Sequence, residues 1–355
     1  MRKLLVFPFC REFAEFARYS ESLKDFDEII PVSPNGFGIV GEDTSKSDGG
    51  EFIGSEVTGD FETALENANA MFIDYVDSAL TIENYKSKIS LAVNKNKPVY
   101  ITQSLKTLIA DDELLKDTKV LEYSEPQLQD ITWNNLLEIP VPVIMVLGLG
   151  DCCNKFNMQV KLGKYLGEKG YAVSQVGTKE YSEMFGIEPL PKFLFGTMDM
   201  HTKIKKFNQY IYDRVKSDDS EAVIIGIPGG IVQTTPFIFE EFGEMAYIIS
   251  NAIRADVCIL NVYAQELSEE YLDSLLDICK YKFNFPVEYI NVSNTHLHIS
   301  PEDKGFKYIT VTSEYVTTNV INTFDYEKAH LFNCLDKKSS QAAYEKILTE
   351  LTDNI

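Results

Sequence analysis

Basic residues are scarce in this chain, which has 33 Lys and Arg against 54 Asp and Glu in 355 residues. The formal net charge is −21, whereas nucleic acids and anionic membranes are bound by positive surfaces that displace counterions. We therefore expect neither a nucleic acid nor a membrane as a partner. An acidic surface suits solubility or the docking of a basic peptide, and it leaves room for one local basic site.

Long hydrophobic runs are also missing. No segment approaches the roughly 18 consecutive apolar residues of a membrane-spanning helix. The amino-terminal apolar run, 3–9, is followed at once by Arg11 and Glu12, so it is too short for the core of a signal peptide. We expect a cytoplasmic protein in which this run forms a first β-strand.

The C-x-x-C spacing and a complete set of metal-ligating residues around a histidine are missing as well. The six cysteines form no C-x-x-C pair, and scattered cysteines in a reducing compartment are usually small buried hydrophobes. His296 and His298 would share one face of an extended segment, but no carboxylate or cysteine at ligand spacing completes a metal site. We expect surface histidines and no bound metal.

Strand-like and helix-like segments alternate along the chain, which predicts parallel sheets with helices on both faces. The strand-like runs lie at 3–9, 27–33, 70–76, 97–103, 141–150, 171–178, 221–230, 256–263 and 287–293. The predicted class is α/β with two doubly wound domains. Residues 1–124 are expected to form a Rossmann-like domain and residues 141–355 a P-loop-NTPase-like domain with a mostly parallel sheet. The segment 125–140 does not continue the alternation of strand-like and helix-like segments. It contains the only tryptophan, Trp133, and is expected to be a linker.

The segment GLGDCCNKF, residues 148–156, has the order of parts of a phosphate-binding loop. It follows an apolar run and precedes a helical pattern, and the amino terminus of a helix attracts phosphate. Gly148 and Gly150 give the backbone the freedom to curl its N–H groups around an anion. Lys155 stands where the lysine of such a loop contacts phosphate. We expect this segment to bind a phosphate group.

Two residues depart from the usual phosphate-loop pattern. Asn154 replaces the glycine before the lysine, and Asn adopts left-handed conformations more readily than most residues. Phe156 replaces the Ser or Thr whose hydroxyl holds Mg²⁺. The dinucleotide pattern G-x-G-x-x-G fits no better, because Cys153 occupies its third position. Efficient hydrolysis of Mg-ATP is therefore not expected.

Two further turns follow neighbouring strand-like runs and belong to the same predicted site. Parallel strands present their carboxyl ends on one edge of the sheet, where ligands bind. We therefore expect these turns to surround the same anion as Lys155. The residues at these turns are Gly177, Thr178, Lys179, Gly226, Gly229 and Gly230.

Three side chains inside the loop are candidates for chemistry. Cys152 and Cys153 are candidate nucleophiles, redox partners or metal ligands, and a helix amino terminus favours the thiolate form. No histidine lies nearby in sequence to act as a base. Asp151 adds a negative charge where phosphate oxygens would lie, unless it binds a metal or faces away.

The first domain contains a long excursion after its second strand. It begins with SPNGFG, residues 33–38, continues to residue 60, and is rich in Gly, Asp and Ser. Its start is expected at the edge of the sheet. Loops of this length are more often functional or mobile than idle.

Five segments carry a resemblance to a known family. They are KLLVFPFCREFAEFARYS at 3–20, VSPNGFGIVGED at 32–43, GLGDCCNKF at 148–156, SQVGTKEYSEMFG at 174–186 and VIIGIPGGI at 223–231. The chain resembles clostridial peptide maturation system proteins, which occur with a precursor peptide, a radical-SAM maturase and a carrier-like protein. The resemblance implies an accessory role in maturing a ribosomally synthesised, modified (bacteriocin-like) peptide. More distantly, the two-domain layout is similar to bacterial proteins that include an amino-acid N-acetyltransferase and keep a more complete loop.

Three functional hypotheses follow from the sequence. In the first, the protein binds a nucleotide, CoA or phosphopantetheine at 148–155 and assists peptide maturation. In the second, it is a non-catalytic scaffold that docks the precursor peptide or the maturase. In the third, it is an acyl or aminoacyl transferase, because a transferase or ligase-like reaction fits the loop better than ATP hydrolysis. A homo-oligomer is compatible with all three.

Overall fold

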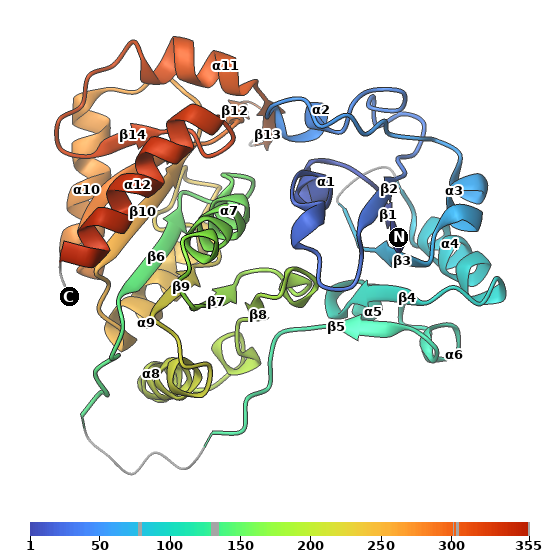
Figure 1. The fold of residues 1–355 in the computed structure, drawn as a ribbon, viewed down its shortest axis with the longest axis horizontal. Helices are drawn as coiled ribbons and strands as arrows, with labels where there is room; N and C mark the ends of the chain where they lie inside the picture. The colour runs from blue at the N-terminus through green and yellow to red at the C-terminus, as the bar shows by residue number, and fades with distance from the viewer. Residues whose placement is uncertain (77–79, 129–134, 301, 303–304, 354–355) are drawn as a thin grey trace. The chain divides into compact units, whose positions relative to one another are not determined.

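The computed structural model describes residues 1–76, 80–128, 135–300, 302 and 305–353 (Figure 1). Its contacts divide the chain into two compact units. The first contains Met1–Tyr123 and Glu180–Pro189, and the second contains Ser124–Lys179 and Leu190–Ile355. Segment 180–189 thus packs with the first unit, which the alternation of elements along the sequence did not indicate. The predicted linker residue Trp133 lies outside the described ranges.

The first unit is built on a parallel sheet with the strand order β2-β1-β3-β4-β5. Its strands are β1 Lys3–Phe7, β2 Glu28–Pro31, β3 Ala70–Ile73, β4 Val99–Thr102 and β5 Lys119–Leu121. The chain moves outward from β1 to β2 and then returns to the other side of β1 as β3. The strand order therefore reverses between β1 and β3, and ligands bind at such points in open α/β sheets.

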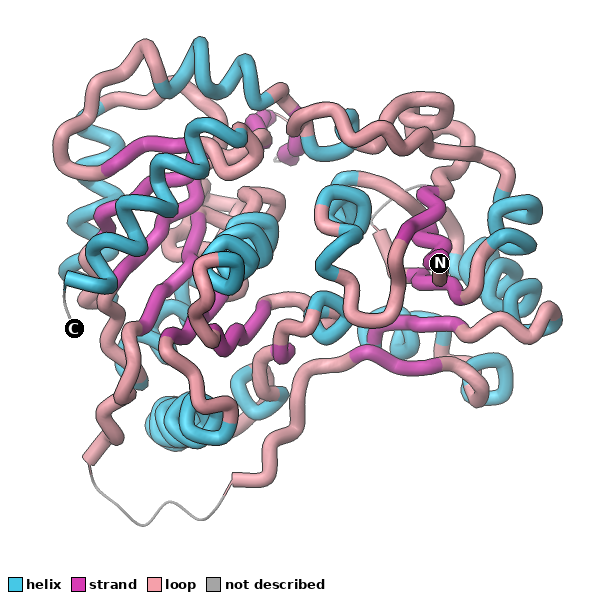
Figure 2. The backbone as a smooth tube through the Cα atoms, viewed as in Figure 1, coloured by secondary structure: helices cyan, strands magenta, loops and turns pink. Residues whose placement is uncertain are grey.

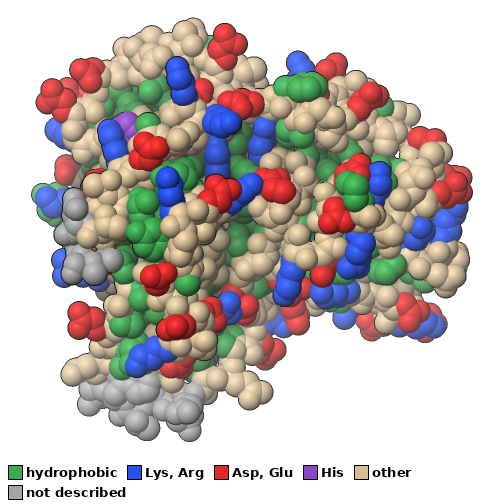
Figure 3. Space-filling model, in the orientation of Figure 1, with side chains coloured by type: hydrophobic (Ala, Val, Ile, Leu, Met, Phe, Trp, Pro, Cys, Tyr) green, Lys and Arg blue, Asp and Glu red, His purple; other side chains and the backbone are tan. Residues whose placement is uncertain are grey.

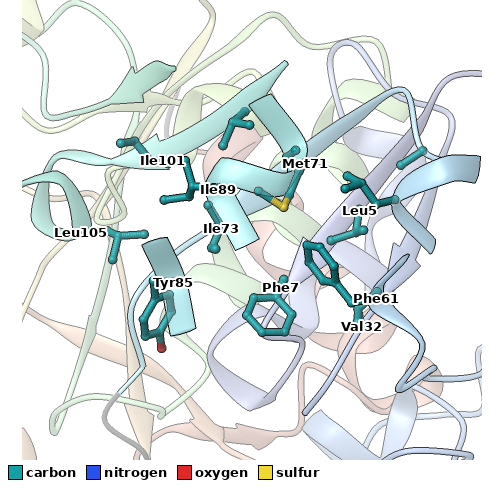
Figure 4. Close-up of a cluster of buried hydrophobic side chains, with 14 of the residues drawn as sticks. Leu5, Phe7, Val32, Phe61, Met71, Ile73, Tyr85, Ile89, Ile101 and Leu105 are labelled. Carbon is teal, nitrogen blue, oxygen red and sulfur yellow. The ribbon is translucent and has the colours of Figure 1, made fainter. Parts of the chain in front are cut away.

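Short helices connect these strands and cover the sheet. They are α1 Ala14–Arg18, α2 Ser45–Asp48, α3 Phe61–Asn67, α4 Ile82–Asn94, α5 Gln103–Ile109 and α6 Asp112–Leu115, with 3-10 turns at Arg11–Phe13, Ser20–Ser22 and Ser182–Phe185. Strand residues such as Phe7 and Ile73 pack against Tyr85 and Ile89 of α4 in one buried cluster (Figure 4). This burial is the main driving force for folding of the unit.

Segment 180–189 is fixed in the first unit by one aromatic side chain. The Tyr181 ring lies 5.3 Å from the rings of Phe16 and Phe72 and 5.9 Å from that of Phe13. Its hydroxyl donates a 2.6 Å hydrogen bond to the buried Glu15 carboxylate. The segment therefore contributes both apolar packing and a polar partner to the unit, and ends in the two-residue strand β8, Glu188–Pro189.

The long excursion 33–60 is folded, although Figure 2 shows most of it as loop around α2. The Asp43 carboxylate accepts hydrogen bonds from four backbone N–H groups between residues 45 and 55, at 2.8–3.2 Å. The Arg18 guanidinium makes two hydrogen bonds to the buried Asp48 carboxylate, at 2.8 and 2.6 Å. These contacts anchor the excursion to α1.

The second unit contains a parallel sheet in which β14-β11-β10-β6-β9-β7 are neighbours in that order. The strands are β6 Val143–Gly148, β7 Val173–Gly177, β9 Ala222–Gly226, β10 Val257–Val262, β11 Val287–Val292 and β14 His330–Phe332. Strand β6 is central and fully buried. The predicted α/β class with mostly parallel sheets is confirmed.

Helices cover both faces of this sheet. They are α7 Lys155–Glu168, α8 Met200–Ser217, α9 Glu244–Ala252, α10 Glu269–Phe283, α11 Ser313–Val316 and α12 Lys337–Asp353, with shorter turns at Lys192–Leu194, Glu240–Gly243 and Thr317–Ile321. Figure 1 shows α7 and α12 in front of the sheet and α9 and α10 behind it. On the front face, Met158 and Leu162 of α7 and Tyr344 of α12 pack against Val146 and Ile259.

Two segments of the second unit depart from a regular alternation of parallel strands and helices. Strand β13, Gly305–Thr310, does not join the main sheet and pairs with β12, Thr295–Ser300, in an antiparallel hairpin. Helix α9 begins only at Glu244, because residues 240–242 adopt left-handed backbone conformations.

The surface bears charges of both signs. Figure 3 shows acidic and basic side chains interspersed over the face that it draws. His296 Nδ1 lies 2.8 Å from the Ala264 carbonyl oxygen, and His298 is exposed. In the described ranges, no group of three or more His, Cys, Asp and Glu side chains is arranged to hold a metal ion. None of the helices in those ranges is long and apolar enough to cross a membrane.

Candidate phosphate-binding site

The segment 149–154 lies at the carboxyl end of the central strand β6 and leads directly into α7. After α7 the chain goes to β7, two positions away on one side, then to β9 beside β6, and then to β10 on the other side. The strand order therefore changes direction at β6. In doubly wound sheets this is the point where connections diverge and leave room for a ligand.

The backbone of this loop alternates in handedness. Cys152 has a φ of 55° and Asn154 a φ of 64°, whereas Cys153 between them does not have a positive φ. Asn154 therefore adopts the left-handed conformation expected for it. In the described part of the chain, the N–H groups of Gly150, Asp151 and Asn154 have no hydrogen-bond acceptor. Alternating conformations of this kind bring successive N–H groups into a concave anion-binding arrangement.

Residues from distant segments hold the loop in this shape. The Tyr263 hydroxyl donates to the Asp151 carbonyl oxygen at 2.7 Å. The Thr295 hydroxyl donates to the Cys152 carbonyl oxygen, also at 2.7 Å. The Asn294 N–H donates to Oδ1 of Asn154 at 2.9 Å. Two carbonyl groups and one side chain of the loop are therefore held in place without a ligand.

Behind these contacts lies an asparagine network, formed by the buried side chains of Asn261, Asn291, Asn294 and Asn333. Asn261 donates to the Leu147 carbonyl oxygen, and Asn291 donates to Asn261 Oδ1, both at 2.7 Å. Asn333 donates to Asn294 Oδ1 at 2.7 Å. Satisfied buried networks of this kind make a structure rigid and specific. The sequence signal for them was an asparagine at or just after the end of an apolar strand, which our sequence analysis did not use.

Lys155 joins the two glycine turns that were expected to face each other. Its Nζ donates to the Gly150 carbonyl oxygen at 2.8 Å and to the Gly229 carbonyl oxygen at 2.5 Å. A Cβ atom on Gly230 would come within 2.3 Å of the Leu149 carbonyl oxygen, so only glycine allows this approach. The predicted site residues that the structure brings together are Gly148, Gly150, Asn154, Lys155, Gly229 and Gly230.

The third predicted turn lies next to β9. A Cβ atom on Gly226 would come within 3.0 Å of Thr178 Cγ2. Gly177 is the last residue of β7, and Lys179 follows Thr178. Thr178 therefore lies against the end of β9, whereas the turn carrying Gly229 contacts Lys155 of the loop.

Of the two loop cysteines, Cys153 does not have the character of a nucleophile. Cys153 is buried, its Sγ donates to the Gly150 carbonyl oxygen at 3.0 Å, and a Cβ atom on Gly148 would meet it at 2.5 Å. Burial raises the pKa of the Cys153 thiol and outweighs the opposing charge of Lys155. The thiolate that a helix amino terminus was expected to favour is therefore disfavoured at Cys153, whose side chain fills space under the loop.

Glu240, which the sequence analysis did not single out, lies over both glycine turns. A Cβ atom on Gly150 would come within 2.4 Å of Glu240 Oε1, and one on Gly230 within 2.7 Å of Glu240 Cβ. Burial and the charge of Asp151 raise the pKa of the Glu240 carboxyl, while Lys155 opposes them. The loop therefore has two carboxylates and one ammonium group around it.

The turn that carries Glu240 has an uncommon backbone. Glu240, Glu241 and Phe242 have φ values of 48°, 49° and 55°. Left-handed conformations cost L-residues other than glycine about 1–2 kcal/mol each. The Lys282 ammonium donates to the Phe242 carbonyl oxygen at 2.8 Å, and the Phe239 and Phe242 rings stack 5.4 Å apart. These contacts offset part of that cost and keep the carboxylate over the loop.

One group that usually holds Mg²⁺ in a P-loop protein, the Ser or Thr hydroxyl after the lysine, is replaced here. Phe156 occupies this position and is buried. The loop thus has a curled backbone and an ammonium group, without the hydroxyl that would position Mg²⁺.

Comparison with known proteins supports the fold. No protein-family model and no curated protein matches this chain. Among solved structures, a DUF1611 family protein from Anabaena variabilis matches with a TM-score of 0.60 and 11% identity, over 99% of this chain and 100% of that one. A GTPase in apo form from Pyrococcus abyssi has a TM-score of 0.29 and 17% identity, over 42% of this chain and 66% of that one.

A nucleotide-binding protein in complex with ADP from Archaeoglobus fulgidus has a TM-score of 0.33 and 11% identity, over 59% of this chain and 87% of that one. The TM-scores of the GTPase and of the ADP-bound protein are both below 0.5, so these two similarities do not establish a shared fold. The DUF1611 family protein is similar along its whole length, and at 11% identity that similarity concerns the fold alone. This chain therefore shares the fold of the DUF1611 family protein.

Proposed function

We propose that the second unit binds a phosphate-containing ligand, such as a nucleotide, CoA or phosphopantetheine, through residues 148–155. The observation that carries this proposal is the alternating backbone of Cys152, Cys153 and Asn154 directly before Lys155. Such a backbone offers several N–H groups to one anion, and the helix amino terminus adds a partial positive charge. A bound phosphate would replace a carbonyl partner of Lys155 by a charge-assisted hydrogen bond, which is stronger.

The loop is better suited to anchoring a ligand by its phosphate group than to transferring that phosphate group. Phe156 removes one usual Mg²⁺ ligand, and Asp151 and Glu240 place negative charge beside the loop. Both features disfavour a transferring phosphoryl group, whose transition state is stabilised by metal ions and cations. A ligand that is anchored by its phosphate and used elsewhere, as in CoA or phosphopantetheine, fits the loop best. Its role in peptide maturation, with a precursor peptide, maturase or carrier-like partner, remains a prediction from the family resemblance.

A thermal-unfolding titration tests the proposal. Pyrophosphate, CoA and ATP are added separately to the full chain in the presence of EDTA, with sodium chloride at matched ionic strength as the control. A ligand at a concentration 100 times its Kd should stabilise the fold by about 2.7 kcal/mol, and the midpoint should rise with concentration. If none of the three compounds raises the midpoint more than sodium chloride does, the proposed site is wrong.

Glu240→Gln is expected to tighten pyrophosphate binding about tenfold near neutral pH. It removes one negative charge beside the loop, and a charge a few Å away is worth about 1–4 kcal/mol at the effective dielectric constants of water and of protein surfaces. The difference from the wild type should shrink as the pH falls, because protonated Glu240 is as neutral as glutamine. Calorimetric titration at several pH values measures this difference.

The exposed Glu168, at the opposite end of α7 from Lys155, provides the control for this experiment. Glu168→Gln makes the same chemical change about 20 Å along the helix and should alter the affinity much less. The raised pKa of Glu240 also has a consequence for stability, since the folded state then binds the proton more tightly than the unfolded chain. Ionised Glu240 therefore weakens the fold at neutral pH, and this penalty disappears as the pH falls through its folded-state pKa. Equal affinities of the wild type and Glu240→Gln at neutral pH would remove Glu240 from the site.

A further inference from the structure

An aromatic pair, formed by Phe239 and Phe242, lies on the turn that carries Glu240. The two rings stack with their centroids 5.4 Å apart and their planes 26° from parallel. Phe239 is 49% exposed and Phe242 is 60% exposed, so each ring presents apolar surface to solvent. Exposed apolar residues that stand alone are common, whereas adjacent ones form a surface on which another molecule binds.

The backbone of the turn exposes these rings at a cost. Phe242 has a φ of 55°, and a left-handed conformation is uncommon for a bulky residue. Glu240 and Glu241 before it are also left-handed. Strained backbone of this kind is concentrated at active sites, ligand clamps and switches. The strain at this turn therefore favours a functional role for the side chains that the turn presents.

The turn is held in place through its backbone. A Cβ atom on Gly243 would come within 2.6 Å of the Ile231 carbonyl oxygen and within 2.9 Å of Phe283 Cζ, so the turn packs closely there. The Lys282 ammonium donates to the Phe242 carbonyl oxygen at 2.8 Å. None of these contacts uses the ring of Phe242. The aromatic pair is therefore fixed in position while its rings keep their exposed faces.

The aromatic pair lies next to the phosphate loop. A Cβ atom on Gly150 would come within 2.4 Å of Glu240 Oε1, and one on Gly230 within 2.7 Å of Glu240 Cβ. Consecutive Cα atoms are about 3.8 Å apart, so the Cα atoms of Phe239 and Phe242 lie within roughly 4 and 8 Å of that of Glu240. In a nucleotide, one ribose separates the phosphate groups from the base. The base of a nucleotide held by the loop is therefore within reach of the two rings.

Two tyrosines near the loop have a different role. Tyr263 is buried, and its hydroxyl donates to the Asp151 carbonyl oxygen at 2.7 Å. The half-buried Tyr308 lies beside it, with the ring centroids 6.1 Å apart. These tyrosines support the loop from within the fold. The more exposed phenylalanine pair is better placed to contact a ligand.

We propose that Phe239 and Phe242 form a stacking platform for the base of a nucleotide or CoA whose phosphate is held by residues 148–155. The platform rests on the proposed phosphate site and narrows its ligand to compounds that carry a base. Bases stack on aromatic side chains because every base has a π-face, and such stacking tolerates different bases. Phosphopantetheine has no base and would leave the platform uncovered.

Calorimetric titration of the full chain with ADP and with ribose 5-diphosphate tests the platform. The two compounds carry the same diphosphate on the same sugar, and only ADP has a base. Both titrations contain EDTA and are made at matched ionic strength. ADP should bind about tenfold tighter or more, the effect expected of one stacked base. AMP and 4′-phosphopantetheine, which each have one phosphate at the position compared, extend the comparison to the ligand without a base.

Combining Phe239→Leu with Phe242→Leu locates the base. Leucine keeps an apolar side chain and removes the ring, so the affinity for ADP should fall about tenfold, towards that for ribose 5-diphosphate. The affinity for ribose 5-diphosphate should stay unchanged, and AMP should weaken while 4′-phosphopantetheine does not. Phe52→Leu is the control, because it removes an 80% exposed ring from the first unit and should change none of these affinities. Circular dichroism confirms that the variants are folded.

The outcomes separate the platform from the phosphate site. If neither ADP nor ribose 5-diphosphate binds, both proposals are wrong. If the two bind with equal affinity, the loop holds phosphate and only the platform is rejected. The platform is also rejected if ADP keeps its advantage in the double variant, or if 4′-phosphopantetheine weakens there instead of AMP. Equal losses for ADP and ribose 5-diphosphate would mean that the rings shape the loop and do not contact a base.

Discussion

Lys155→Met should abolish the stabilisation of the fold by pyrophosphate, with a loss of affinity of about 100-fold or more. Methionine keeps most of the length and apolar surface of the lysine stem, so the change removes mainly the ammonium group. Hydrogen bonds to charged groups contribute about 1.5–3 kcal/mol, and the ammonium group is the cation that the structure places between the two glycine turns. Thermal unfolding with and without pyrophosphate measures the loss.

The structural role of Lys155 has to be separated from its role in binding. Its ammonium group also ties together the Gly150 and Gly229 carbonyl oxygens, so the variant without ligand is expected to unfold at a lower temperature. The comparison therefore uses the ligand-induced change for each protein, not the absolute midpoint. Lys164→Met on the same helix is the control, because Lys164 lies near Glu168 on the surface and should leave the response intact. A normal pyrophosphate response in Lys155→Met would mean that the anion binds elsewhere.

Asp48→Ala should lower the free energy of unfolding by about 3–5 kcal/mol. Only 2% of the Asp48 side chain and 13% of the Arg18 side chain are exposed, so the substitution leaves an uncompensated buried guanidinium. The N–H of Gly50 also loses its 2.9 Å bond to the Asp48 carboxylate. Urea unfolding monitored by circular dichroism measures the change, and the first unit should lose its cooperative transition earlier than the second.

A surface ion pair provides the comparison for this prediction. Glu66 pairs with Lys95 at 2.8 Å, but 65% of the Glu66 side chain is exposed, and exposed pairs contribute little to stability. Glu66→Ala should therefore change the unfolding curve much less than Asp48→Ala. Combining Asp48→Ala with Arg18→Met should restore part of the lost stability, because the unpaired charge is removed with its partner. Similar losses in Glu66→Ala and Asp48→Ala would contradict the buried-pair argument.

Much of the fold was predictable because it follows from the local spacing of apolar residues along the sequence. The apolar runs at 141–150 and 221–230 became β6 and β9, and the glycines and Lys155 that follow them meet at the loop. Asn154 was expected to tolerate a left-handed conformation and does so. Spacing within ten residues was enough for these features, since a strand, a turn and a helix start are all local.

The remaining features depend on residues that are distant in sequence. Glu240 reaches Gly150 from 90 positions away, and no period or motif marks it. Tyr181 reads as part of a connection in the second half of the chain, yet its ring fills the core of the first unit. The buried asparagine at 261 looks like a polar interruption of a strand until its partner across the sheet is known. Such contacts are selected by the assembled sheet, which a single sequence does not display.

Because side chains from later strands hold the loop in shape, it cannot be excised from this protein as a working module. A fragment ending before Asn261 would keep the glycines of the site and Lys155, yet it would lack the three side chains that fix the carbonyl groups of Leu147, Asp151 and Cys152, namely those of Asn261, Tyr263 and Thr295. The freed carbonyl groups would form hydrogen bonds with water, and the curled backbone would become one conformer among many. Grafting the nine residues 148–156 onto another scaffold should therefore transfer the sequence of the loop without its conformation.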